Sequence, residues 1–129
     1  MKQWIIIAAV SGFLAVALGA FGAHLLEGRI SEHYLGMWEK AVQYQMFHTG
    51  GLLAIGVLLN IMPSKHLVRA GWCMLAGIIF FSGSLYILAL SGIGIFGAIT
   101  PIGGILFLTG WAFIIVALLS QSKDAGRVA

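Results

Sequence analysis

The chain has 129 residues, of which 60% are hydrophobic and only 9% are charged. A soluble domain of this size must cover most of its surface with polar groups, and typical soluble domains carry about 25% charged residues. The composition therefore excludes a soluble globular domain, a disordered chain and a disulfide scaffold. It predicts an integral membrane protein that forms one domain, residues 1–129.

The positions of the charged residues divide the chain into predicted membrane spans. No charged residue lies in 3–26, 41–64 or 70–122. An apolar helix of about 20 residues crosses a hydrocarbon core of about 30 Å, so the first two stretches each suit one helix. The third suits two helices, with a turn in the glycine-rich segment 91–101, which ends at Pro101. We predict an all-α bundle of four transmembrane helices at about 4–26, 41–62, 67–90 and 99–119, with a polar tail at 120–129.

The first predicted helix resembles a secretory signal, because Lys2 precedes an apolar run and small residues occupy 15–17. The apolar run is longer than a typical signal core, so we expect the helix to be retained as an anchor. Helices pair in lipid by close backbone approach. A helix-packing face is therefore predicted, directed at another helix of the chain or at a second copy, where small residues recur at every fourth position: Ser11, Ala15, Gly19 and Ala23.

The segment before the second span has the pattern of a short amphipathic helix. Ser31 can cap a helix whose first turn contains Glu32, and Tyr34, Leu35 and Trp38 share one face. This pattern predicts a short helix on the outer membrane surface between the first and second spans. The alternative is that these residues run straight into the second span.

Lysine and arginine are unevenly distributed between the two sides of the predicted membrane. The side that holds the N-terminus, the second loop and the C-terminus carries Lys2, Lys65, Arg69, Lys123 and Arg127. The opposite side carries two basic residues beside three glutamates: Arg29, Lys40, Glu27, Glu32 and Glu39. The positive-inside rule predicts a multi-pass protein of the cell membrane with both termini in the cytoplasm. The short tails and loops leave no room for a nucleic-acid-binding module.

Polar side chains inside membrane spans are costly and are the default functional candidates. The predicted topology places most of them in the outer half of the bilayer. Tyr44 and Gln45 precede His48 by four and three residues, so both can support its imidazole on one helical face. Trp111 lies deeper in its span than an interface tryptophan should. The predicted polar cluster contains His24, Gln45, His48, Tyr86 and Thr100.

Three interpretations of this cluster remain open from the sequence. It can be a hydrogen-bond network that fixes helix register, a polar vestibule for a small solute, ion or proton, or a metal site using His24, His48 and a carboxylate. Two histidines far apart in sequence form no ligand-spacing motif, so neither a metal nor another cofactor is predicted. The sequence also lacks a nucleophile elbow, a His-Glu-x-x-His motif and a phosphate-cradling loop, so no enzyme is predicted.

Four segments carry a resemblance to a known family: residues 19–24, 38–45 with His48, 81–86 and 97–104. They resemble the small bacterial membrane proteins grouped as "domain of unknown function 423", which are similar to the eukaryotic transmembrane protein 256 group. The resemblance covers roughly residues 1–119 in the family's order. It implies a multi-pass protein of the cell membrane, and it implies no activity, ligand or catalytic residue.

Two functions are consistent with these observations. The first is a non-enzymatic structural or accessory protein in the lipid bilayer, which self-associates as a homo-oligomer through the packing face or assembles with other membrane proteins. The second is a small transporter or channel that uses the polar cluster to bind a solute, ion or proton.

Overall fold

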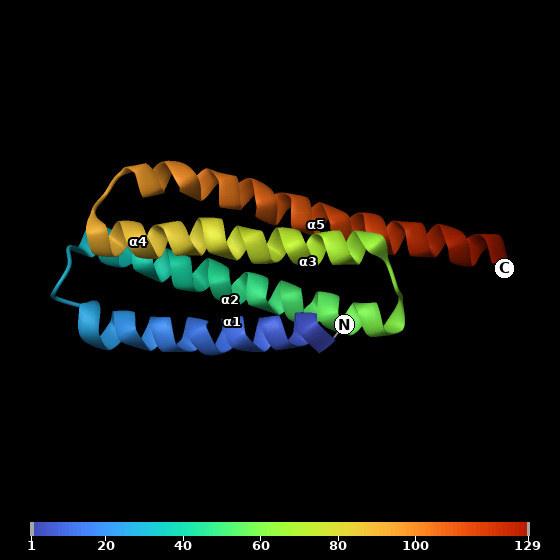
Figure 1. Cartoon of the computed structure of the whole chain (residues 1–129), viewed down its shortest axis with the longest axis horizontal. Helices are drawn as coiled ribbons and strands as arrows, with labels where there is room; N and C mark the ends of the chain where they lie inside the picture. Colours follow the sequence, from blue (N-terminus) through green and yellow to red (C-terminus); the bar gives the residue numbers. More distant parts are fainter. Residues whose placement is uncertain (1, 129) are drawn as a thin grey trace.

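The computed structural model describes residues 2–128, and the regular structure in this range is helical, which confirms the all-α prediction. Four helical rods run back and forth in chain order (Figure 1). They are α1 (Lys2–Phe21) with the π-helical turn η1 (Gly22–Leu26); α2 (Glu32–Ile61); α3 (Lys65–Gly77), η2 (Ile78–Gly83) and α4 (Ser84–Ser91) as one continuous rod; and α5 (Ile95–Val128).

Three of the four rods are long and apolar enough to cross a membrane: Lys2–Leu26, Lys65–Ser91 and Ile95–Asp124. The first two agree closely with the predicted spans 4–26 and 67–90. The rod α2, which contains residues 41–61 of the predicted span 41–62, is not among the three, because glutamines, a histidine and a threonine lie in its middle. The structure therefore has three candidate spans and a fourth rod, α2, which is similar in length but more polar.

The rods pack mainly with their neighbours in the chain. α1 packs on α2, α2 packs on the rod from α3 to α4, and α5 packs on the other side of that rod. One core cluster gathers at the end of the molecule that holds the N-terminus, where Trp4 of α1 packs with Leu52 and Ile55 of α2 and with Leu67 of α3. Trp4 is 2% exposed and lies edge-on to Trp72, so α1 also contacts α3.

The predicted short amphipathic helix is not a separate element, and that prediction is wrong. α2 is one uninterrupted helix from Glu32, and the Ser31 hydroxyl accepts a hydrogen bond from the Tyr34 N–H at 3.3 Å as its N-cap. Trp38 is buried rather than anchored at a membrane surface, and its indole N–H donates to the Leu18 carbonyl at 2.8 Å. The indole fits because Gly22 has no side chain: a Cβ there would lie 2.5 Å from the ring.

The turn before α5 is shorter than predicted. Gly92, at φ 71°, ends α4 in the left-handed conformation that glycine adopts readily, and α5 already begins at Ile95. Pro101 therefore lies inside α5 instead of ending the turn. Proline is tolerated within membrane helices where neighbouring structure compensates for the missing N–H. At its other end α5 continues past residue 119 to Val128, so the predicted tail is helical to that point, and Ala129 lies outside the described residues.

The small-residue face of α1 lies mostly against α2 of the same chain. Ser11 and Ala15 are buried, and the Ser11 hydroxyl oxygen lies 2.6 Å from that of Thr49. A Cβ at Gly19 would lie 3.3 Å from Val42 of α2. Ala23, on η1, is exposed. The intramolecular alternative therefore describes three of the four residues of this face.

Two adjacent glycines of α5 provide a test of how closely it packs. We expect Gly103→Ala to lower the free energy of unfolding by about 1–3 kcal/mol, because a Cβ there would overlap the backbone of Phe81, lying 2.7 Å from its Cα. Gly104→Ala makes the same change where no heavy atom lies within 4 Å, so its stability should equal or exceed that of the wild type. Unfolding in detergent, followed by circular dichroism, compares the two variants; equal stability would contradict the close approach.

Candidate functional site: paired polar groups beside an aromatic groove

Gln45, in the middle of α2, links three helices through its side-chain amide. The residue is 4% exposed. Its amide nitrogen donates to the Ser11 carbonyl on α1 at 3.1 Å and lies 3.4 Å from the Ser11 hydroxyl. Its amide oxygen accepts a hydrogen bond of 2.6 Å from the Tyr86 hydroxyl on α4. One glutamine therefore satisfies polar groups on both neighbouring rods.

Other polar side chains near the middle of the rods have partners of the same kind. The Thr49 hydroxyl pairs with that of Ser11. Ser82, within η2 and fully buried, donates to the Ala41 carbonyl of α2 at 2.7 Å. Among the described residues, His66 Nδ1 is the one buried side-chain nitrogen or oxygen without a hydrogen-bond partner. Nearly all buried polar side chains among the described residues therefore have a hydrogen-bond partner.

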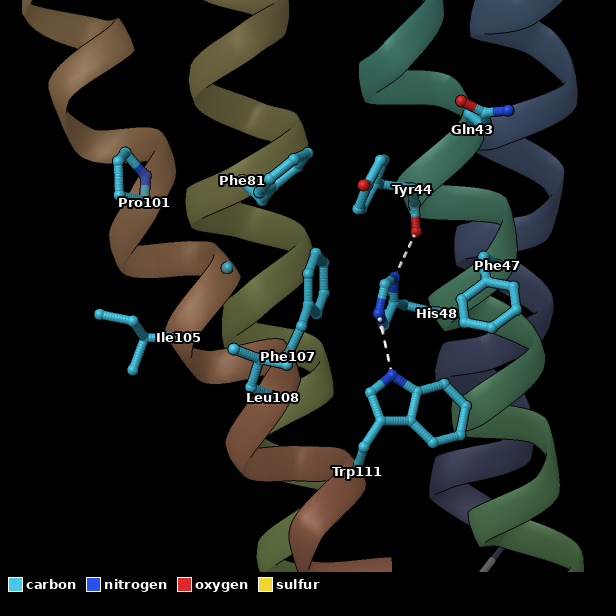
Figure 2. Close-up of a pocket in the computed structure, with 11 residues that line it drawn as sticks. Gln43, Tyr44, Phe47, His48, Phe81, Pro101, Ile105, Phe107, Leu108 and Trp111 are labelled. Carbon is cyan, nitrogen blue, oxygen red and sulfur yellow. Dashed lines mark hydrogen bonds between the residues drawn. The ribbon is translucent and has the colours of Figure 1, made fainter.

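His48 is held by two hydrogen bonds of opposite kind. Its Nδ1 lies 2.7 Å from the Tyr44 carbonyl, and its Nε2 lies 3.1 Å from the indole nitrogen of Trp111 on α5 (Figure 2). An indole N–H can only donate, so Nε2 is the acceptor and Nδ1 carries the proton. The imidazole is therefore neutral, and neither ring nitrogen is free to bind a proton or a metal without breaking a bond.

The structure divides the predicted polar cluster into separate parts. Gln45 and Tyr86 are brought together, whereas His48 bonds to Trp111. Thr100 pairs with the Ser84 hydroxyl at 2.7 Å, and His24 is exposed on η1. The five residues therefore do not surround one common space.

Sequence reasoning missed two of the partners. Ser11 was assigned to helix packing, yet it also accepts from Gln45. One feature of the sequence pointed to Trp111. It lies deep within the fourth predicted span, whereas tryptophans that anchor a helix lie at the membrane surface. Nothing in the spacing of the sequence relates Trp111 to His48, because they are 63 residues apart.

The metal interpretation finds no donor set in the structure. Within residues 2–128, as far as they are described, no three or more His, Cys, Asp or Glu side chains gather closely enough to hold an ion. His48 uses both ring nitrogens within the protein, and His24 lies exposed at the end of α1 and η1.

An open groove of about 810 Å³ lies beside His48, between α2 and α5. The two helices form its walls, with Tyr44 and Phe47 on one side and Ile105 and Leu108 on the other (Figure 2). Phe81 of η2 lies between the walls. The eleven lining residues are Gln43, Tyr44, Phe47, His48, Phe81, Pro101, Gly104, Ile105, Phe107, Leu108 and Trp111.

Comparison with known proteins identifies the family of this chain. Residues 18–104 match the family described as "Protein of unknown function (DUF423)". The chain belongs to this family. The match confirms the resemblance seen in the four sequence segments, and it includes η1, α2, the rod from α3 to α4 and the start of α5.

Similar proteins are named as membrane proteins. The chain is 56% identical over 117 residues to a UPF0382 membrane protein of Staphylococcus aureus, covering 91% of this chain and 95% of the relative. It is 53% identical over 119 residues to one of Staphylococcus epidermidis, covering 92% and 97%, and 50% identical over 118 residues to one of Bacillus subtilis, covering 91% and 96%. No solved structure matches the chain.

Two glutamines of α2 differ sharply in their surroundings and form a matched pair of test positions. Gln45→Leu removes the partner of both Ser11 and Tyr86, so we expect the free energy of unfolding to fall by about 1–3 kcal/mol. Gln43→Leu changes an exposed residue and should alter it by less than about 0.5 kcal/mol. Denaturant titration in detergent micelles measures both. A loss at Gln43 equal to that at Gln45 would contradict the linking role of Gln45.

Proposed function

We propose that this member of the UPF0382 membrane proteins is a non-enzymatic structural or accessory protein, with four helices that cross the cell membrane and both termini in the cytoplasm. The observation that carries the proposal is the pairing of the polar side chains of α2. Gln45 and Thr49 bond to α1, Gln45 also bonds to α4, and His48 bonds to α5. Polar groups used in this way hold helices in register.

The same pairing supports α2 as the fourth membrane-crossing helix. α2 is 30 residues long, which corresponds to about 45 Å, more than the thickness of a hydrocarbon core. Its polar side chains lower its hydropathy, but those at positions 45, 48 and 49 bond to neighbouring helices and need no water. A helix with its polar groups covered in this way is compatible with lipid on its remaining surface.

The distribution of charge supports the proposed orientation. The N-terminus, the connection between α2 and α3 and the far end of α5 lie at the same end of the molecule (Figure 1). This end carries the exposed residues Lys2, Lys65, Arg69 and Lys123, whereas Glu27 and Glu32 lie in or beside the connection at the opposite end. The basic end is assigned to the cytoplasm by the positive-inside rule.

Self-association stays a prediction, but the surface through which copies of the chain would meet can no longer be the small-residue face of α1. Ser11, Ala15 and Gly19 lie against α2, so this face is occupied within one chain. Copies of the chain, or other membrane proteins, would have to meet through helix faces that remain exposed. The alternative function, a small transporter or channel, loses the arrangement on which it rested, because His24, Gln45, His48 and Thr100 have separate surroundings.

A structural role for His48 can be tested directly against a transport role. We expect His48→Phe, which keeps a ring beside Phe107, to lower stability while leaving proton and ion flux into liposomes at the wild-type level. A double-mutant cycle with Trp111→Phe should give a coupling energy of about 0.6 kcal/mol and at most about 1.7 kcal/mol, the average and the maximum for hydrogen bonds between membrane helices. Proton flux that exceeds that of protein-free liposomes and disappears in His48→Phe would favour the transporter.

The orientation of α2 is open to a labelling experiment. In a Cys73→Ser background, we expect a membrane-impermeant maleimide to label Arg29→Cys, which precedes α2, in intact cells. Lys65→Cys, which follows α2, should react only after the membrane is opened, and Ser122→Cys on α5 serves as a second cytoplasmic position. All three positions are exposed in the structure. Labelling of positions 29 and 65 from the same side would show that α2 does not cross.

A further inference from the structure

Three residues that lower the regularity or the intrinsic stability of a helix lie in the lining of the groove between α2 and α5. Phe81 belongs to the π-helical segment η2, and such segments occur frequently at functional sites. Pro101 cannot donate a backbone hydrogen bond within α5. Gly104 has no side chain, and a Cβ there would meet no heavy atom within 4 Å. Each feature lowers the regularity or the stability of its helix, and all three lie in the lining of the groove.

The groove is unusually rich in aromatic rings. Five of its eleven lining residues are Phe, Tyr or Trp, which make up 12% of the chain, and the imidazole of His48 adds a sixth ring. The rings of Phe47 and Trp111 lie 5.4 Å apart at 44°, with Phe47 64% exposed. A ring that lies offset-stacked or edge-to-face against an aromatic side chain gains attraction beyond that of the apolar area it buries. The walls therefore favour a planar occupant over a saturated chain.

The polar groups of the groove are uncharged and lie toward one end. Among the described residues, the eleven that line it include no Asp, Glu, Lys or Arg, and His48 is neutral and already has two partners. The Tyr44 hydroxyl and the Gln43 amide form no hydrogen bond within the described part of the chain, and they lie at the end opposite Trp111 (Figure 2). The Tyr44 hydroxyl can donate to an oxygen of an occupant, whereas a lipid acyl chain would leave it without a partner.

We propose that this groove binds a neutral, membrane-soluble molecule of the quinone class, a planar ring that bears carbonyl oxygens and an apolar tail. The ring packs among the aromatic side chains, and a carbonyl oxygen accepts from the Tyr44 hydroxyl. The tail follows Ile105 and Leu108, which are 64% and 73% exposed on α5. A volume of about 810 Å³ lies within the range of pockets that hold small ligands and cofactors. The proposal concerns binding and includes no redox step.

The hydrogen-bonding part of the proposal is tested with decylubiquinone and the full-length protein in detergent micelles. We expect saturable quenching of tryptophan fluorescence, because Trp111 lines the groove. Tyr44→Phe removes only the hydroxyl and should weaken binding by about 2- to 10-fold, which corresponds to one hydrogen bond. Tyr34→Phe removes a hydroxyl outside the groove and should leave binding unchanged. Equal affinity of Tyr44→Phe and the wild type would overturn the assigned donor.

The location of the site is tested by a second matched pair. Gly104→Leu places a side chain into the groove and should weaken decylubiquinone binding by at least about tenfold. Gly50→Leu makes the same change on α2, at an exposed position outside the groove lining with no heavy atom near its Cβ, and should bind as the wild type does. Thermal unfolding checks that both variants fold. If Gly104→Leu does not fold, the affinity of Tyr44→Phe for decylubiquinone tests the site instead. The proposal would be overturned if the wild type showed no saturable binding of decylubiquinone. It would also be overturned if oleate displaced the bound quinone at the same concentration as added quinone does.

Discussion

The structure depends on one constraint, which is that a polar side chain buried among apolar helices has no water to bind. Gln45, His48 and Thr49 occupy the middle of α2, where they lower the hydropathy of that helix below the level its neighbours reach. Each is satisfied by a side chain or carbonyl on an adjacent rod. The least apolar of the four rods, α2, therefore forms side-chain hydrogen bonds to each of the other three.

Small residues decide how closely the rods approach. Gly22 and Gly71 make room for the rings of Trp38 and Trp4, and Gly103 lies against the backbone of Phe81. These contacts bring α1 against α2, and α5 against η2, without any force from excluded water, which lipid does not supply. Between α2 and α5 an open groove remains, and the hydrogen bond from Trp111 to His48 bridges it.

Family membership describes the class of protein, whereas the geometry of the site describes what its polar residues do. The relatives are named as membrane proteins, which agrees with the apolar helices of the structure. The paired polar groups account for residues that would otherwise suggest a transport pathway, since a histidine with both nitrogens bonded within the protein serves first to connect helices. The groove is a separate feature, with open volume, exposed rings and a Tyr44 hydroxyl that has no hydrogen-bond partner among the described residues.

The class of protein, the helical fold and the approximate ends of the first and third rods follow from the amino-acid sequence, because the cost of burying charge is a local property of each residue. The sequence also identified Gln45, His48 and Tyr86 as polar residues that need explanation. Only the tertiary structure decided their partners, since Ser11 and Trp111 are distant in the chain and no spacing rule connects residues on different helices. The packing of the helices also shows that α2 runs unbroken from Glu32, with Trp38 buried and bonded to the Leu18 carbonyl, and that Pro101 lies within a helix rather than at its start.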